Sequence, residues 1–184
     1  MWVTGGKAKG TRLKTLPSRS VRPTTSIVKQ AVFSVLENRN TNWSRVLDLY
    51  AGSGALGIEA MSRGAEWVDF VDQRKSCCDI IRVNLDKVGG LERAHVYCCG
   101  VNKAIGFLSN SYDIIFLDPP YADLSVNASL DTVANSNLPA DNCTIVLCHA
   151  NRLPLDSDYD GVHLVEQRRY GDTFVSIYQK ESQL

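Results

Sequence analysis

Apolar residues after residue 45 fall into two repeating patterns, short runs and longer stripes. The runs are rich in β-branched, leucine and aromatic residues, which is typical of strands. They lie at 46–50, 67–72, 95–99, 112–118 and 144–148. Between them, apolar residues recur at helical spacing near 55–63, 75–88, 101–109 and 125–136. This alternation predicts an α/β fold with a doubly wound, mostly parallel sheet.

The C-terminal part follows a different pattern. After Pro154 the helical stripes stop, and two alternating runs at 162–168 and 173–179 flank Tyr170-Gly171-Asp172. A short turn between alternating runs predicts an antiparallel hairpin at the end of the sheet.

The N-terminal part reads as an arm followed by a helix. Glycines and cations alternate too closely for a helix between Gly5 and Leu13, which predicts a flexible loop or a short hairpin. After Arg22-Pro23-Thr24, with Thr24 or Thr25 as N-cap, apolar residues from Val28 to Leu36 form one helical stripe that ends near Asn38. We therefore expect an arm and helix over 1–44 and a sheet domain over 45–184.

The net charge is zero but unevenly distributed. Residues 1–45 carry nine Lys or Arg and one acid, whereas the remainder carries 11 basic and 19 acidic residues. Clustered cations beside an acidic body favour a contact with nucleic acid, although a solvated basic tail without a partner is the alternative. The expected contacts are Lys7, Lys9, Arg12, Lys14 and Arg22.

Cysteine and histidine usage argues against disulfides and metal. Four of the six cysteines form adjacent pairs, no C-x-x-C spacing occurs, and the three histidines are scattered. We expect small buried thiols and no metal site. The chain also lacks an apolar run of the roughly 20 residues that span a bilayer and a signal-peptide core, so we expect a cytoplasmic protein without a membrane partner.

The first strand leads into a glycine-rich turn, Ala51-Gly52-Ser53-Gly54-Ala55-Leu56-Gly57. A G-x-G-x-x-G turn that opens a helix lets a cofactor approach the backbone. Asp72 follows at the end of the second strand, where a carboxylate can hold ribose hydroxyls. Asp48 precedes the loop and either orients it or approaches a cationic amino group. These residues alone do not distinguish a dinucleotide from S-adenosylmethionine.

The fourth strand ends in Asp118-Pro119-Pro120-Tyr121. The carboxylate of Asp118 and the carbonyl of Pro119 can accept hydrogen bonds from an exocyclic NH2 group, and Tyr121 offers a stacking face for a base. Because ligands of doubly wound sheets bind beyond the carboxyl ends of the strands, both motifs should share one crevice. A methyl donor beside an amine clamp explains the combination, whereas a dinucleotide oxidoreductase has no evident need for it.

The sequence resembles the bacterial 16S ribosomal RNA guanine-N2 methyltransferases, which are amino-methyltransferases of the Asp-Pro-Pro-Tyr class. The resemblance rests on the opening Gly6–Gly10, Arg22-Pro23-Thr24, the segment from Asp48 to Gly57, Asp118-Pro119-Pro120-Tyr121 and the closing Tyr170-Gly171-Asp172-Thr173. It implies a Rossmann-like methyltransferase fold with a seven-stranded sheet, S-adenosylmethionine as donor, and a guanine of 16S rRNA in a partly assembled small subunit. It places catalysis at Asp118, Pro119, Pro120 and Tyr121, and cofactor binding at Asp48, Ala51, Gly52, Gly54, Asp72, Gln73, Gly100 and Asp118.

The chain departs from this pattern in two places. Cys99-Gly100-Val101-Asn102 lacks the acid expected to read the adenine amine, so Asn102 or a backbone carbonyl is the substitute, and Ser26 and Gln30 stand where the first helix should be acidic. The alternatives are a DNA adenine-N6 methyltransferase, for which the chain lacks a base-reading domain, and a non-catalytic nucleic-acid-binding module on the same fold.

Overall fold

A computed structural model describes residues 1–16, 26–39, 41–120, 123, 125–150 and 155–182. Its strands belong to one sheet in the order β3-β2-β1-β4-β5-β8-β7-β6. Strands β1 to β5 are parallel to one another, whereas β8, β7 and β6 each pair antiparallel with the strand before them in this order. The strands are β1 (Arg45–Leu49), β2 (Trp67–Val71), β3 (Ala94–Tyr97), β4 (Tyr112–Leu117), β5 (Pro139–Ala150), β6 (Asp158–Tyr159), β7 (Val162–Tyr170) and β8 (Thr173–Lys180). This is the predicted Rossmann-like, doubly wound architecture with a terminal hairpin.

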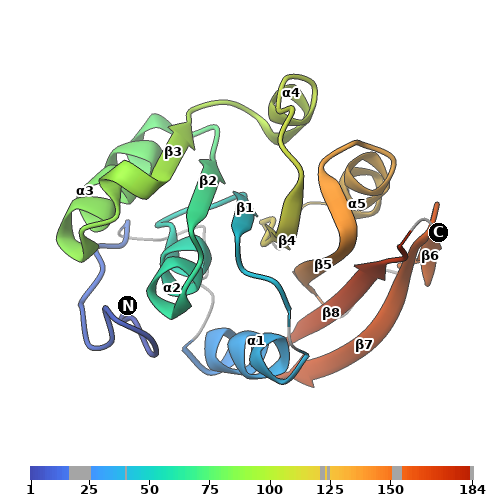
Figure 1. Ribbon diagram of the computed structural model, residues 1–184, viewed down its shortest axis with the longest axis horizontal. Helices are drawn as coiled ribbons and strands as arrows, with labels where there is room; N and C mark the ends of the chain where they lie inside the picture. Colours follow the sequence, from blue (N-terminus) through green and yellow to red (C-terminus); the bar gives the residue numbers. More distant parts are fainter. Residues whose placement is uncertain (17–25, 40, 121–122, 124, 151–154, 183–184) are drawn as a thin grey trace.

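Helices cover both faces of the sheet (Figure 1). One face packs against α1 (Ser26–Asn38), α2 (Ala55–Arg63) and α3 (Lys75–Val88). The other packs against α4 (Val101–Ile105) and α5 (Val126–Ala134), and a short 3-10 helix, η1 (Leu91–Arg93), precedes β3. Both faces of the parallel strands are therefore buried, which explains their nearly continuous apolar sequences.

The N-terminal arm is a hairpin docked on the body rather than a flexible loop. Val3 and Thr11 pair through a 3.0 Å backbone hydrogen bond, and Leu13 donates to Met1 at 2.8 Å. Val3 and Leu13 are buried in the same apolar cluster as α1, α2 and the sheet. Figure 1 shows the hairpin beside α2 and α3.

A buried ion pair holds this hairpin in place. Lys29 on α1 lies 2.7 Å from Glu59 on α2, and both side chains are 0% exposed. Lys29 also donates to the backbone oxygen of Trp2 at 2.6 Å, while Thr4 donates to Glu59 through its backbone N–H at 2.9 Å. Burial raises the pKa of Glu59, but the hydrogen bonds from Lys29 and Thr4 outweigh it and hold the pKa below its usual value.

The structure corrects several expected boundaries. The helix expected over 101–109 ends at Ile105, before Gly106, and β5 begins at Pro139 rather than near 144. Asn142 adopts φ 61° inside β5, where the pairing with β4 shifts register, so a polar stretch that resembles a turn is part of the strand. The two-residue β6 brings the sheet to eight strands rather than seven.

The cysteines follow the expectation only in part. Cys77, Cys78, Cys143 and Cys148 are buried, but Cys98 is exposed and Cys99 half-buried, because β3 ends at Tyr97 and these two residues lie beyond the strand. Among the described residues, all six thiols are free and no cluster of three or more His, Cys, Asp or Glu is arranged to hold a metal ion. No helix in the described ranges is long and apolar enough to cross a bilayer.

Candidate active site

The order in which strands are added to the sheet reverses between β1 and β4, which are parallel neighbours with Leu49 opposite Leu117. From β1 the chain proceeds to β2 and β3 on one side, and from β4 to β5 on the other. Such a reversal opens a crevice beyond the carboxyl ends of the two central strands, where ligands of doubly wound sheets bind. The glycine loop leaves β1 at this point, and Asp118 directly follows β4.

The glycine loop leaves its backbone accessible at Gly52 but not at Gly57. Gly52 and Gly54 adopt φ 58° and 76°, in the left-handed region that glycine enters without strain. A Cβ atom at Gly52 would meet no neighbouring atom closer than the Tyr50 oxygen at 3.9 Å, so the space beside this backbone is open. At Gly57 a Cβ would lie 2.3 Å from the Phe70 ring, so this glycine serves helix–strand packing instead.

Asp72 fastens the loop to the end of β2. One carboxylate oxygen accepts the Gly52 backbone N–H at 2.9 Å, and the other accepts the Arg74 backbone N–H at 2.8 Å. Each oxygen retains acceptor capacity, so the same carboxylate can also receive ribose hydroxyls.

Asp48 on β1 holds the C-terminal end of the glycine loop through a hydrogen bond to Gly57. Its side chain is 1% exposed and accepts the backbone N–H of Gly57 at 2.8 Å. Burial raises the pKa of Asp48 to about 8, and the nearby charges of Asp118 and Asp72 push in the same direction against the Gly57 hydrogen bond. Asp72 and Asp118, which follow β2 and β4, therefore both act electrostatically on Asp48 of β1.

The segment after β4 is partly buried. Asp118 is half-buried, Pro119 is buried and Pro120 is exposed, with the Pro120 carbonyl accepting a 2.8 Å hydrogen bond from the Asp123 N–H. Tyr121 lies outside the described residues. The structure thus places Asp118 directly after β4, the neighbour of the strand that leads into the glycine loop.

Two further side chains, which the sequence analysis did not identify, support the loop. Asn84 on α3 is fully buried and donates to the Ser53 backbone oxygen at 2.9 Å. Tyr50 adopts φ 60°, which is uncommon for a residue other than glycine, and its hydroxyl lies 2.9 Å from the Ser129 hydroxyl of α5. In the sequence, Asn84 falls on the same helical stripe as the apolar residues Ile81 and Leu85. A polar residue at such a position was the available signal.

The remaining expected cofactor residues lie around this edge. Ala51 is buried and donates its backbone N–H to Val71 at 3.0 Å, whereas Gln73 is exposed directly after Asp72. Gly100 is the residue before α4, and Asn102 in the first turn of that helix is exposed.

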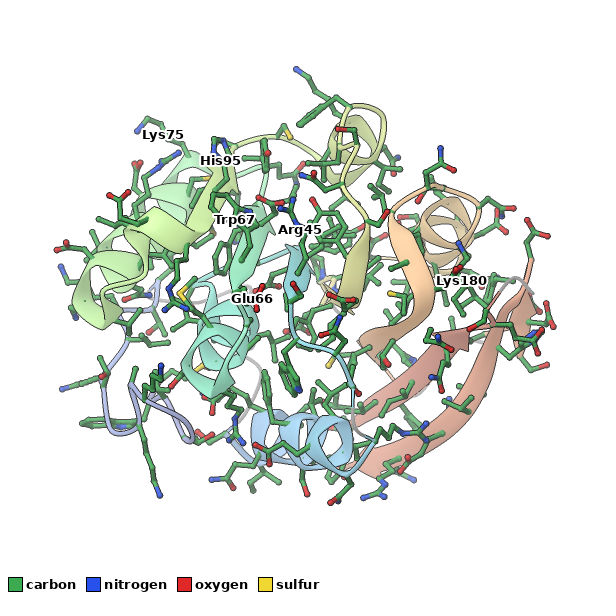
Figure 2. All side chains as sticks on the ribbon, in the orientation of Figure 1. Arg45, Glu66, Trp67, Lys75, His95 and Lys180 are labelled. Atoms are coloured by element: carbon green, nitrogen blue, oxygen red, sulfur yellow. The ribbon has the colours of Figure 1, made fainter. Side chains whose placement is uncertain are left out.

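The basic residues divide into an exposed set and a structural set. Lys7, Lys9, Arg12 and Lys14 are exposed on the hairpin, and Arg22 lies outside the described residues. Three other cations that contribute to the N-terminal charge are engaged in the body: Lys29 with Glu59, Arg39 with Glu166 at 3.0 Å, and Arg45 over the Trp67 ring at 6.0 Å. Figure 2 shows Arg45 and Trp67 on the neighbouring strands β1 and β2. The charge asymmetry therefore overstates the number of cations available to a phosphate backbone.

Comparison with known proteins identifies relatives over the full chain. The family model for conserved hypothetical protein 95 matches residues 1–179. YlbH of Bacillus subtilis, a candidate rRNA methyltransferase by name, is 33% identical over 98% of this chain and 99% of its own. Ribosomal RNA small subunit methyltransferase D of Buchnera aphidicola (Baizongia pistaciae) is 30% identical over 82% of this chain and 76% of its own.

Solved structures share the fold. The methyltransferase candidate yhhF of Escherichia coli superposes with a TM-score of 0.85 at 23% identity, over 100% of this chain and 99% of that one. The hypothetical protein TTHA0928 of Thermus thermophilus gives 0.80 at 28% identity, over 98% and 99%. The architecture is thus the Rossmann-like fold found in S-adenosylmethionine-dependent methyltransferases.

Proposed function

The chain belongs to the conserved hypothetical protein 95 family, and from this premise we propose that it transfers a methyl group from S-adenosylmethionine to the exocyclic N2 amine of a guanine in 16S ribosomal RNA. The observation that carries the proposal is the position of Asp118 directly after β4, at the point between β1 and β4 where the strand order changes direction. There its charge acts on Asp48, which lies beneath the glycine loop. A carboxylate that can accept hydrogen bonds from an amine, next to a loop that can hold a methyl donor, suits transfer of a methyl group to an exocyclic nitrogen.

The residues of the crevice fit S-adenosylmethionine. The open backbone at Gly52 admits the amino-acid portion of the donor, and Asp72 has acceptor capacity left for ribose hydroxyls. Asp48, held mainly protonated near neutral pH by burial, can ionise when a cationic ligand arrives. When bound, the donor supplies an electrophilic methyl group on a sulfonium.

The chemical work of the protein is to prepare the amine. Asp118 and the carbonyl of Pro119 accept hydrogen bonds from its two protons, which favours a pyramidal nitrogen whose lone pair is no longer delocalised into the ring. Tyr121 supplies the stacking face for the extruded guanine. Alignment of the nitrogen with the methyl group would contribute much of the rate. The N–C bond would form as the C–S bond of the donor breaks and the thioether leaves, and the nitrogen would pass one proton through the Asp118 carboxylate to water.

The exposed cations of the hairpin carry the RNA contact. Lys7, Lys9, Arg12 and Lys14 are exposed on one element that is anchored to α2 and α3. Neutralisation of RNA phosphates by such a cluster gives affinity without sequence preference, so the choice of guanine falls to the crevice and to RNA shape. A partly assembled small subunit in the cytoplasm is the proposed setting.

One experiment separates this proposal from its rivals. The protein is incubated with labelled S-adenosylmethionine and naked 16S rRNA, immature small subunits or duplex DNA, and the modified nucleotide is mapped. N2-methylguanine in rRNA supports the proposal. N6-methyladenine in DNA, or donor binding without transfer to any of the three, overturns it.

A further inference from the structure

The outer face of the N-terminal hairpin carries an exposed tryptophan beside an arginine. Trp2 and Arg12 are directly opposite each other across the two strands, and the Arg12 guanidinium lies over the Trp2 ring at 5.9 Å from its centroid. The neighbouring residues Val3 and Leu13 point inward and are buried, whereas Trp2 is 53% exposed. The indole thus keeps about half of its surface in solvent, next to the guanidinium of Arg12, where a flat ligand can reach it.

The backbone beneath this tryptophan is held firmly. Lys29 donates to the Trp2 oxygen at 2.6 Å, and the Ser62 hydroxyl of α2 accepts the Ala8 N–H at 2.9 Å. Lys87 of α3 donates to the Arg12 oxygen at 3.3 Å. A ligand that stacks on Trp2 therefore meets a platform that is already ordered and loses less conformational entropy on binding.

The surroundings select an anionic aromatic ligand. Trp2 is the only large apolar side chain exposed on the described part of the hairpin, and Lys7, Lys9 and Lys14 are exposed on the same element. Residues 1–16 contain no Asp or Glu. A lone aromatic face among cations suits an unpaired nucleotide, whose base stacks while its phosphate is neutralised, better than a protein surface, which needs a wider apolar patch.

The platform is connected to the cofactor loop through a short path. Lys14, two residues or about 7 Å of extended chain beyond Arg12, exchanges two hydrogen bonds with the buried Asn84, at 2.8 and 2.9 Å. Asn84 also binds the Ser53 oxygen of the glycine loop. A nucleotide bound to the hairpin would thus be connected to the glycine loop through Lys14 and Asn84.

We propose that Trp2 and Arg12 form a stacking site for an unpaired RNA base outside the catalytic crevice, an inference that rests on the proposed RNA substrate. The base stacks on the exposed part of the indole, and Arg12 presents its charge to the adjoining phosphate. The ligand class is single-stranded RNA, such as a loop or bulge, because bases in a duplex have no free face.

The test compares Trp2→Ala and Trp2→Phe with the wild-type protein by fluorescence anisotropy, using a labelled single-stranded RNA and a blunt duplex of the same sequence. Because Lys29 binds the backbone of Trp2 and not its side chain, both variants should keep the hairpin folded. Trp2→Ala should weaken binding of the single strand by about 5- to 150-fold, the equivalent of one lost base stack. Trp2→Phe should retain most of the affinity, and duplex binding should change by less than twofold.

The control is Val165→Ala, which trims a similarly exposed apolar side chain, 43% exposed, on β7 near the opposite edge of the sheet from β2 and β3. It should bind both RNAs as the wild type does. Equal affinity of Trp2→Ala and wild type for the single strand would overturn the inference. Methylation of rRNA by the wild type is measured in parallel, so failure of the proposed function is seen separately as absent transfer.

Discussion

Asp72 at the end of β2 accepts a hydrogen bond from the backbone N–H of Gly52, 20 residues earlier, at 2.9 Å. Its second carboxylate oxygen accepts the Arg74 N–H. The residue is therefore an acceptor for two backbone groups before any ligand arrives, so it sets the shape of the glycine loop at the proposed cofactor site.

Substitution of Asp72 should consequently disturb donor binding even when the change is conservative. An asparagine offers one acceptor oxygen, so Asp72→Asn leaves either the Gly52 or the Arg74 N–H unsatisfied, at a cost of about 1–3 kcal/mol. We expect titration calorimetry to show donor affinity lowered by roughly tenfold or more. Asp79→Ala, which removes an exposed acid paired with Lys75 on α3, is the control and should bind the donor normally. Normal affinity in Asp72→Asn would contradict the role of both oxygens.

The two loop glycines should respond differently to a side chain. Gly52→Val adds atoms to open space, so it should reduce donor affinity with a modest loss of stability from its positive φ. Gly54→Val should abolish donor binding and also lower thermal stability, because its Cβ would lie 3.3 Å from Ile58 and Ile81. Calorimetric donor titration and thermal unfolding of both variants separate the two effects. Unimpaired donor binding in Gly52→Val would exclude the loop as the cofactor site.

Removal of the Asp118 carboxylate should affect chemistry more than cofactor binding. Asp118→Ala should keep donor affinity nearly intact and lower the methylation rate by roughly 10²-fold, as loss of one positioned polar group does in other active sites. Asp118→Asn should fall between wild type and Ala because its amide oxygen still accepts one hydrogen bond. Single-turnover methylation with saturating donor measures the rate. A folded, donor-binding Asp118→Ala that methylates rRNA at the wild-type rate would sink the amine-clamp hypothesis.

Asp48 should make stability depend on pH. Its pKa in the folded state is about 8, well above that of an unfolded aspartate near 4, so the folded protein binds more protons between these values. The contribution of Asp48 to the free energy of unfolding should therefore fall as pH rises from about 4 to about 8, by up to about 1.4 kcal/mol per pH unit.

Urea unfolding between pH 5 and pH 8 measures this dependence. Asp48→Asn carries no titrating proton, so its stability should vary less steeply with pH than that of the wild type. Parallel profiles for the two proteins would show that Asp48 is ionised in the folded state.

The two classes of N-terminal lysine should separate in a paired experiment. Lys7→Glu with Lys9→Glu should weaken RNA binding and flatten its salt dependence, by up to about one unit of log-log slope for each phosphate that is no longer neutralised, while stability stays level. Lys29→Met should instead lower the free energy of unfolding by about 3 kcal/mol, because it leaves the Glu59 carboxylate buried without one of its partners.

Salt titrations of RNA affinity and denaturant unfolding of both proteins provide the measurements. A salt slope that remains at the wild-type value after reversal of Lys7 and Lys9 would mean that the hairpin lysines are merely solvated.

Much of the fold was predictable because its signals are local. Helices over 55–63 and 75–88 match α2 and α3, since apolar spacing is a property of neighbouring residues. The glycine loop and Asp118 could likewise be placed at strand ends, and parallel pairing then requires those ends to share one edge.

Only the tertiary structure decided which polar residues are exposed and which are buried with internal partners. Lys29 and Lys7 count equally toward the basic charge of the N-terminal part. Lys29 is nevertheless buried, because on α1 it forms an ion pair with Glu59 on α2, 30 residues later in the chain. Asn84 joins Lys14 to Ser53, which are remote from it in sequence. The sequence alone determined the periodic elements and the motifs, whereas long-range packing decided burial and partners, since the energy of a charge or amide depends on what surrounds it rather than on its neighbours along the chain.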